Sequence, residues 1–142
     1  MPQEERKEPF PAEKRTTAKV ILVVEDDEDI GEFIASAISL VADSDYRLVP
    51  DASQALHFAK SIQPDLLILD YRLRGMHGLE LYDHLHATSG LEAIPALLVT
   101  AVKLDVNLRA AIGKRQIIVV EKPFDLDEFL LTVQRLLGNR SG

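Results

Sequence analysis

Four consecutive large aliphatic residues at positions 66–69 limit the possible folds of this chain more than any other stretch. They are preceded by Pro64 and Asp65 and followed by Asp70. A strand with one face in water would alternate apolar and polar residues, so this run predicts a strand buried on both faces. Strands of this kind form parallel sheets, and ligands bind such sheets beyond the carboxyl ends of the strands. Asp70 therefore follows the strand at a position where a ligand site is expected.

Four other stretches are predicted to be strands, at 20–24, 46–49, 96–100 and 117–120. Apolar residues at helical spacing predict helices between and after the strands, at 28–41, 52–62, 78–89, 102–112 and 126–137. Strand and helix thus alternate five times, and the short connections favour right-handed crossovers. This pattern predicts a single flavodoxin-like (βα)5 domain of the α/β class. Its parallel five-stranded sheet would have strand order 2-1-3-4-5 and helices on both faces.

The first 18 residues differ from the rest of the chain. They contain three prolines among charged residues, with Phe10 as the large apolar side chain. We expect residues 1–18 to form a disordered tail and residues 19–140 to form the domain. A length of 142 residues suits one such domain.

Composition and charge narrow the class of function. The chain contains no cysteine, so disulfides and thiolate metal sites are excluded. No apolar run is long enough to span a membrane, and the first residues contain no apolar signal-peptide segment, so we expect a cytoplasmic protein without membrane insertion. The formal net charge of −7 disfavours direct binding to nucleic acid.

Acidic side chains are expected to meet at one edge of the sheet. Glu25 and Asp26 follow the first strand and Asp70 follows the third, and these strands are neighbours at the switch point of the 2-1-3-4-5 order. Like charges at close range raise one another's pKa values, and a divalent cation would relieve this conflict. Oxygen ligands without histidine or cysteine beside them favour Mg²⁺.

A hydroxyl and an ammonium group are expected near the same point. Thr100 ends the fourth strand and Lys122 follows the fifth. Together with Mg²⁺, these groups could stabilise the oxygens of a phosphoryl group, with Asp70 as the carboxylate nucleophile of a phosphoryl transfer.

With these residues in place, the sequence resembles the receiver domain of two-component response regulators, of the chemotaxis-regulator-like, stand-alone kind. Four groups of residues carry the resemblance, which extends from Lys19 to Leu137: Val23-Val24-Glu25-Asp26-Asp27, Leu69-Asp70 with Gly75 and Gly78, Val99-Thr100-Ala101, and Lys122-Pro123-Phe124. The resemblance implies a phosphorelay switch that alters protein contacts. It implies no enzyme in the ordinary sense, beyond intrinsic self-phosphorylation and self-dephosphorylation.

The resemblance also implies a role for each site residue. Asp70 would accept a phosphoryl group from a histidine kinase or a histidine phosphotransfer protein. Thr100 would be the switch hydroxyl, Lys122 would pair with the phosphoryl group, and the Lys122–Pro123 bond would be cis. The Mg²⁺ ligands would be Glu25, Asp26, Asp70 and the backbone carbonyl of Arg72, with Asp26 as the closer of the acidic pair.

Two departures from the family pattern bear on the readout of the switch. Val119 stands where the family often has an aromatic residue that moves with the threonine, and Arg74 stands where proline is common. Two alternatives stay open: a receiver-fold interaction module that works without phosphorylation, and a receiver excised from a larger hybrid kinase or regulator. An aspartyl phosphatase is disfavoured, because the second acid that such enzymes use is replaced here by Arg72.

Overall fold

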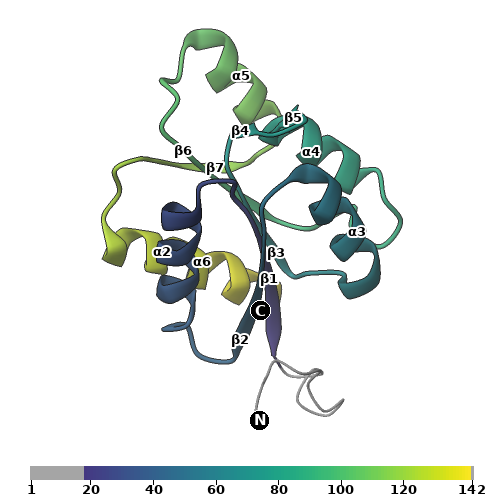
Figure 1. Cartoon of the computed structure of the whole chain (residues 1–142), viewed down its shortest axis with the longest axis vertical. Coiled ribbons are helices and arrows are strands. Elements are labelled where there is room, and N and C mark those ends of the chain that lie inside the picture. The colour runs from purple at the N-terminus through teal and green to yellow at the C-terminus, as the bar shows by residue number, and fades with distance from the viewer. Residues whose placement is uncertain (1–17, 142) are drawn as a thin grey trace.

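A five-stranded parallel sheet forms the centre of the protein (Figure 1). The computed structural model describes residues 18–141, so nearly all of the expected tail at 1–18 lies outside the described residues. The sheet consists of β1 Lys19–Val24, β2 Ser44–Val49, β3 Leu66–Leu69, β6 Ala96–Thr100 and β7 Ile118–Glu121. Its order is β2-β1-β3-β6-β7, which is 2-1-3-4-5 when the strands of this sheet are counted along the chain. The predicted topology is confirmed.

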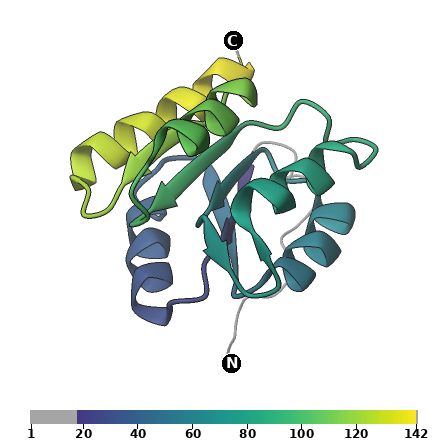
Figure 2. The same ribbon diagram turned by 90° about the horizontal axis from the view of Figure 1, so that it is seen from above.

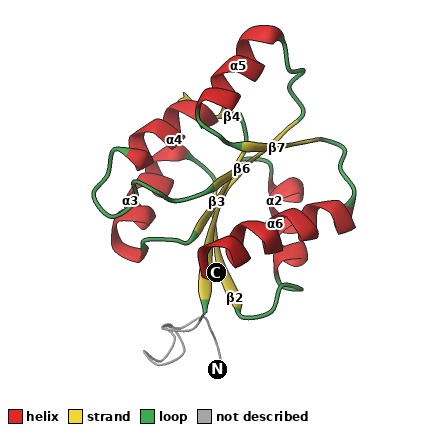
Figure 3. Ribbon diagram, turned by 180° about the vertical axis from the view of Figure 1, so that it is seen from behind, coloured by secondary structure: helices red, strands yellow, loops and turns green. Residues whose placement is uncertain are grey.

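Helices cover both faces of the sheet (Figures 1 and 2). They are α2 Glu28–Ile38, α3 Ala52–Ile62, α4 Gly78–His86, α5 Val106–Lys114 and α6 Leu126–Ser141. The first and last of these cover one face, and the other three cover the opposite face, an arrangement that Figure 3 shows from behind. Among the described residues, no helix is long and apolar enough to cross a lipid bilayer.

The sheet separates two apolar clusters. Neighbouring strand residues point to opposite faces, so Leu22 packs into the cluster under α3 and α4, and Val23 packs into the cluster under α2 and α6. Leu66 to Leu69 are all at most 1% exposed, as predicted for a strand covered on both faces. The second cluster is centred on Phe129 of α6, which is fully buried.

Aspartates fix where several helices begin. Asp27 caps α2 by accepting a hydrogen bond from the Ile30 amide at 3.1 Å. Asp105 caps α5 in the same way, through the Leu108 amide at 2.8 Å. The prediction that this helix starts at 102 was therefore wrong, because an aspartate three residues later supplies the cap.

The ends of four helices differ from the predictions. α2 ends at Ile38 rather than 41 and α4 at His86 rather than 89, whereas α5 continues to Lys114 rather than 112 and α6 to Ser141 rather than 137. Phe33, which the helical spacing of apolar residues places on the inner face of α2, is 46% exposed and packs against Phe124 with ring centroids 5.7 Å apart.

The chain after β3 forms a short hairpin that the sequence pattern did not predict. Strands β4 Arg72–Leu73 and β5 Met76–His77 pair in antiparallel fashion. Gly75 at the turn has a φ of 90°, a backbone conformation that glycine adopts without strain. The hairpin connects the end of β3 directly to the start of α4.

Candidate functional site: a carboxylate cluster at the sheet edge

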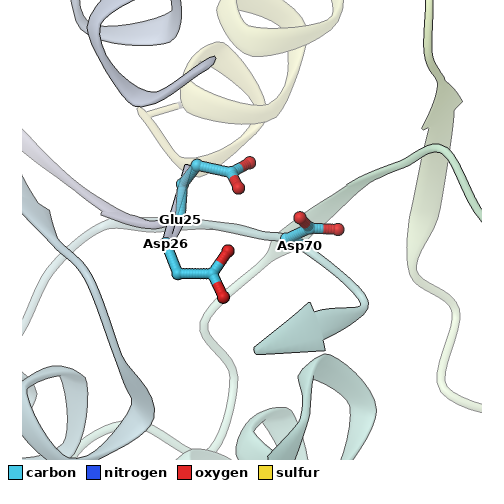
Figure 4. Close-up of side chains that lie close together, drawn as sticks. All are labelled: Glu25, Asp26 and Asp70. Carbon is cyan, nitrogen blue, oxygen red and sulfur yellow. The ribbon is translucent and has the colours of Figure 1, made fainter. Parts of the chain in front are cut away.

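Three carboxylates lie together at the carboxyl edge of the sheet. Parallel pairing sets Val24 opposite Leu69, so the residues that follow β1 and β3 are neighbours. One carboxylate oxygen from each of Glu25, Asp26 and Asp70 lies within 4.8 Å of the other two. Figure 4 shows the first two side chains leaving one segment and the third leaving another. The structure thus brings together the three acids that the sequence placed at the switch point.

Lys122 reaches the same cluster from the end of β7. Its ammonium nitrogen lies 3.3 Å from Oε1 of Glu25 and 3.4 Å from Oδ2 of Asp70. The Lys122 amide also donates a hydrogen bond to the Thr100 carbonyl at 2.8 Å, which ties this residue to the end of β6. The Lys122–Pro123 bond is cis, as the resemblance implied.

Thr100 ends β6 with a completely buried side chain. Its hydroxyl oxygen accepts a hydrogen bond from the Val102 amide at 3.0 Å. Within the described part of the chain, no hydrogen bond has this hydroxyl as its donor. The hydroxyl hydrogen is therefore free to bind an acceptor that enters from outside.

Burial and crowding perturb the titration of Glu25. This side chain is 5% exposed, and burial is the main cause that raises its pKa from 4.5 to about 7. The nearby charge of Asp70 raises the pKa further, while Lys122 and the Asp27 amide, which donates to Oε2 at 3.2 Å, oppose the rise. Because burial makes the charged form of Glu25 unfavourable, this carboxylate is suited to bind a cation in addition to Lys122.

The donor set fits a hard divalent cation. All three acids offer oxygen, and Mg²⁺ binds to one or two carboxylates together with waters and phosphate oxygens. Arg72, whose carbonyl was predicted as a further ligand, lies in β4 two residues beyond Asp70, with an exposed side chain.

We expect the cation-free protein to lose stability as the pH rises from about 4.5 to about 7. In this range the unfolded chain has released the Glu25 proton while the folded chain still holds it, so the folded state binds more protons. Glu25→Gln should flatten this part of the stability profile. It should also raise the free energy of unfolding above pH 7 by roughly 1–3 kcal/mol.

Urea unfolding in the presence of a chelator, repeated across this pH range, measures the effect. Glu32→Gln is the matched control, because this glutamate is exposed on α2, and it should leave the profile unchanged. If the free energy of unfolding changes with pH equally in wild type and Glu25→Gln, Glu25 is not the cause of this pH dependence.

The backbone around Asp70 is held by Gly78, a role that the sequence pattern did not reveal. Of the two glycines in this loop, Gly75 has a positive φ and Gly78 does not. Gly78 instead opens α4, and a Cβ on it would clash with the Asp70 carbonyl oxygen. Its amide donates to the Tyr71 carbonyl at 2.6 Å.

Strand order and the side chains at the strand ends together define a class of protein. It is a flavodoxin-like domain whose switch point carries three carboxylates, with a lysine that follows β7 paired to them. The backbone amide of this lysine is hydrogen-bonded to the threonine that ends β6. The model of the response regulator receiver domain family matches residues 21–134. The chain belongs to this family, and it is a signalling domain of two-component systems.

Curated relatives share about a third of the aligned residues. The hybrid signal transduction histidine kinase D of Dictyostelium discoideum is 32% identical over 121 residues, which cover 83% of this chain and 8% of that protein. The DNA-binding response regulator MtrA of Mycolicibacterium smegmatis is 32% identical over 123 residues, which cover 86% of this chain and 52% of that protein. The chain thus spans about half the length, or less, of these relatives.

Solved structures of receiver domains have the same fold. The receiver domain of an HD domain-containing protein from Pseudomonas fluorescens has a TM-score of 0.78 at 27% identity, covering 88% of this chain and 90% of that one. The chemotaxis response regulator CheY4 of Vibrio cholerae has a TM-score of 0.76 at 23% identity, covering 85% of this chain and all of that one. At the latter identity the likeness establishes the fold alone.

Proposed function

We propose that this domain is a phosphoacceptor switch, in which Asp70 receives a phosphoryl group from a histidine kinase or a histidine phosphotransfer protein. The observation that carries the proposal is the convergence on Asp70 of two further carboxylates and one ammonium group from separate strands. A carboxylate that only ended a strand would need none of these partners. The phosphorylation-independent module leaves the convergence unexplained.

In this proposal Glu25, Asp26, Asp70 and the carbonyl of Arg72 hold Mg²⁺. The ion would supply positive charge to the phosphoryl oxygens and would permit all three acids to be ionised together. Asp26 is more exposed than Glu25, which agrees with its proposed place as the closer ligand of the pair. Glu25, the more buried acid of the pair, would then act mainly as a negative charge behind the ion.

The transfer itself requires one bond to form and one to break. A carboxylate oxygen of Asp70 attacks the phosphorus atom, and the bond between phosphorus and the histidine nitrogen of the donor breaks, with its electron pair staying on that nitrogen. Lys122 already lies 3.4 Å from Asp70, where its ammonium group can pair with the transferred phosphoryl group. The Thr100 hydroxyl can donate its hydrogen to a second phosphoryl oxygen.

Phosphorylation would be read out as a change in protein contacts. It adds nearly two negative charges at Asp70. A Thr100 hydroxyl drawn toward them would disturb its hydrogen bond with the Val102 amide, at the start of the segment that leads to α5. Val119 is half-buried against the cluster under α3 and α4, so the readout would proceed without an aromatic side chain at this position. The surface that responds would consist of α5, β7 and α6.

The place of this domain in its cell and in a longer chain is also a proposal. We assign the domain to residues 19–140, with residues 1–18 as a tail, and a cytoplasmic location, which agrees with the absence of cysteine from the sequence. Relatives include both a hybrid kinase and DNA-binding regulators, so a receiver taken from a longer protein remains the second candidate.

Incubation with acetyl phosphate and Mg²⁺ tests the proposed function. We expect the intact mass to rise by one phosphoryl group, located on Asp70 by peptide mapping, and a chelator to prevent the increase. A protein that gains no phosphoryl group under these conditions, with correct folding verified by circular dichroism, would favour the phosphorylation-independent module.

A further inference from the structure

A groove outside the carboxylate cluster lies between α3 and the β4–β5 hairpin, two elements that Figure 1 labels. Its volume is about 650 Å³. Leu56 from the helix and Met76 from the hairpin form an apolar base, and both side chains are half-buried. The groove shares no residue with the proposed phosphoacceptor site.

The rim of this groove is positively charged. Lys60 and Arg74 line it from opposite elements, and both side chains are exposed. Neither forms an ion pair within the described part of the chain. The whole chain has a formal net charge of −7, so a groove in which cations outnumber acids differs in sign from the whole chain.

One acid, Asp51, also lines the groove, so two cations against one carboxylate leave the lining a formal charge of +1. Asp51 accepts a hydrogen bond from the Gln54 amide at 2.9 Å, and its carboxylate thereby caps α3. His57 also lines the groove and is exposed. The groove therefore offers an apolar contact between cations that lack a protein partner.

We propose that this groove binds an acidic segment of a partner protein. An apolar side chain of that segment would lie on Leu56 and Met76, and carboxylates on either side of it would pair with Lys60 and Arg74. A small inorganic anion would leave the apolar base unused. An acidic peptide with an apolar residue uses both features of the groove.

Binding here would contact the hairpin that immediately follows Asp70, yet it requires no phosphorylation. The hairpin contributes Arg74 and Met76 to the groove, and its last residue precedes Gly78, which packs against the Asp70 carbonyl. This proposal does not rest on the phosphoacceptor function and is tested on the unphosphorylated protein.

The probe is a pentapeptide, Glu-Glu-Leu-Glu-Glu, blocked at both ends and titrated into the isotope-labelled full chain while backbone amide signals are recorded by NMR. We expect the signals that move to lie in α3 and in residues 72–77. The double variant Lys60→Glu with Arg74→Glu should bind the peptide at least about tenfold more weakly, because two attractive pairs become repulsive.

Three controls make the result specific. The double variant Lys103→Glu with Arg109→Glu changes the net charge equally at exposed positions near and within α5, and it should bind like wild type. The peptide Gln-Gln-Leu-Gln-Gln should bind far more weakly than the acidic one, as should inorganic phosphate and a short single-stranded DNA.

The proposal is overturned if Lys60→Glu with Arg74→Glu binds the acidic peptide as well as wild type does. It is equally overturned if the neutral peptide, phosphate or DNA binds as tightly as the acidic peptide, or if the shifted signals lie outside the groove. Circular dichroism of each variant verifies that a loss of binding is not a loss of folding.

Discussion

Asp70→Asn is expected to reduce phosphorylation by acetyl phosphate to background, a loss of about a hundredfold or more. The asparagine amide keeps the size of the side chain but is a poor nucleophile, and it also removes one carboxylate from the cluster. Intact-mass measurement over time gives the rate of phosphoryl gain. Continued incorporation at the wild-type rate would mean that another residue is the acceptor.

Asp27→Asn is the matched control for this experiment. Asp27 belongs to the same acidic triplet as Glu25 and Asp26, but its side chain caps α2, and asparagine caps a helix equally well. We expect its phosphorylation rate to stay within about twofold of wild type, because a nearby exposed charge has a small effect in water. A comparable loss in both variants would point to the charge of the triplet rather than to a nucleophile.

Phe129→Ala is expected to lower the free energy of unfolding by about 3–5 kcal/mol. Phe129 is fully buried at the centre of the cluster between α2, α6 and the sheet, so its removal leaves a cavity that neighbouring strand residues cannot fill. Urea unfolding followed by circular dichroism measures the change. This loss is a large part of the stability of an ordinary domain, so the variant should be studied at low temperature.

Leu131→Ala on the same helix provides the comparison. Leu131 is 58% exposed, and its truncation should change stability by less than about 0.5 kcal/mol. Similar losses in the two variants would contradict the role of Phe129 in core packing, because alanine is the best helix former and neither substitution lowers helix propensity.

Much of the fold follows from the sequence, because buried parallel strands and amphipathic helices leave strong periodic patterns. The apolar runs at 20–24 and 66–69 predicted the neighbouring strands β1 and β3. The acids that follow these strands predicted which side chains meet. Strand order was accessible because few connections are possible between short βα units. These features depend on several residues acting together, so no single contact can reverse them.

Structural details that depend on a single contact could not be predicted from the sequence. The β4–β5 hairpin contains only two paired residues in each strand, too few for a periodic signal. Phe33 lies on the predicted buried face of α2, yet it packs against Phe124 from a distant loop and stays partly exposed. The sequence predicted that Lys122 lies near the acids, but its pairing with Glu25, 97 residues away, is seen in the folded chain alone.

The packing of Gly78 against Asp70 determines where the chain can vary in length. The Gly78 amide and the Tyr71 carbonyl close the base of the hairpin, and a side chain at Gly78 would collide with the Asp70 backbone. Extra residues inserted between Arg74 and Gly75 would enlarge only the exposed tip. Residues inserted between Asp70 and Arg72 would separate the carboxylate from the base that holds it. The protein can therefore acquire a longer loop beside its groove while the reacting side chain keeps its position.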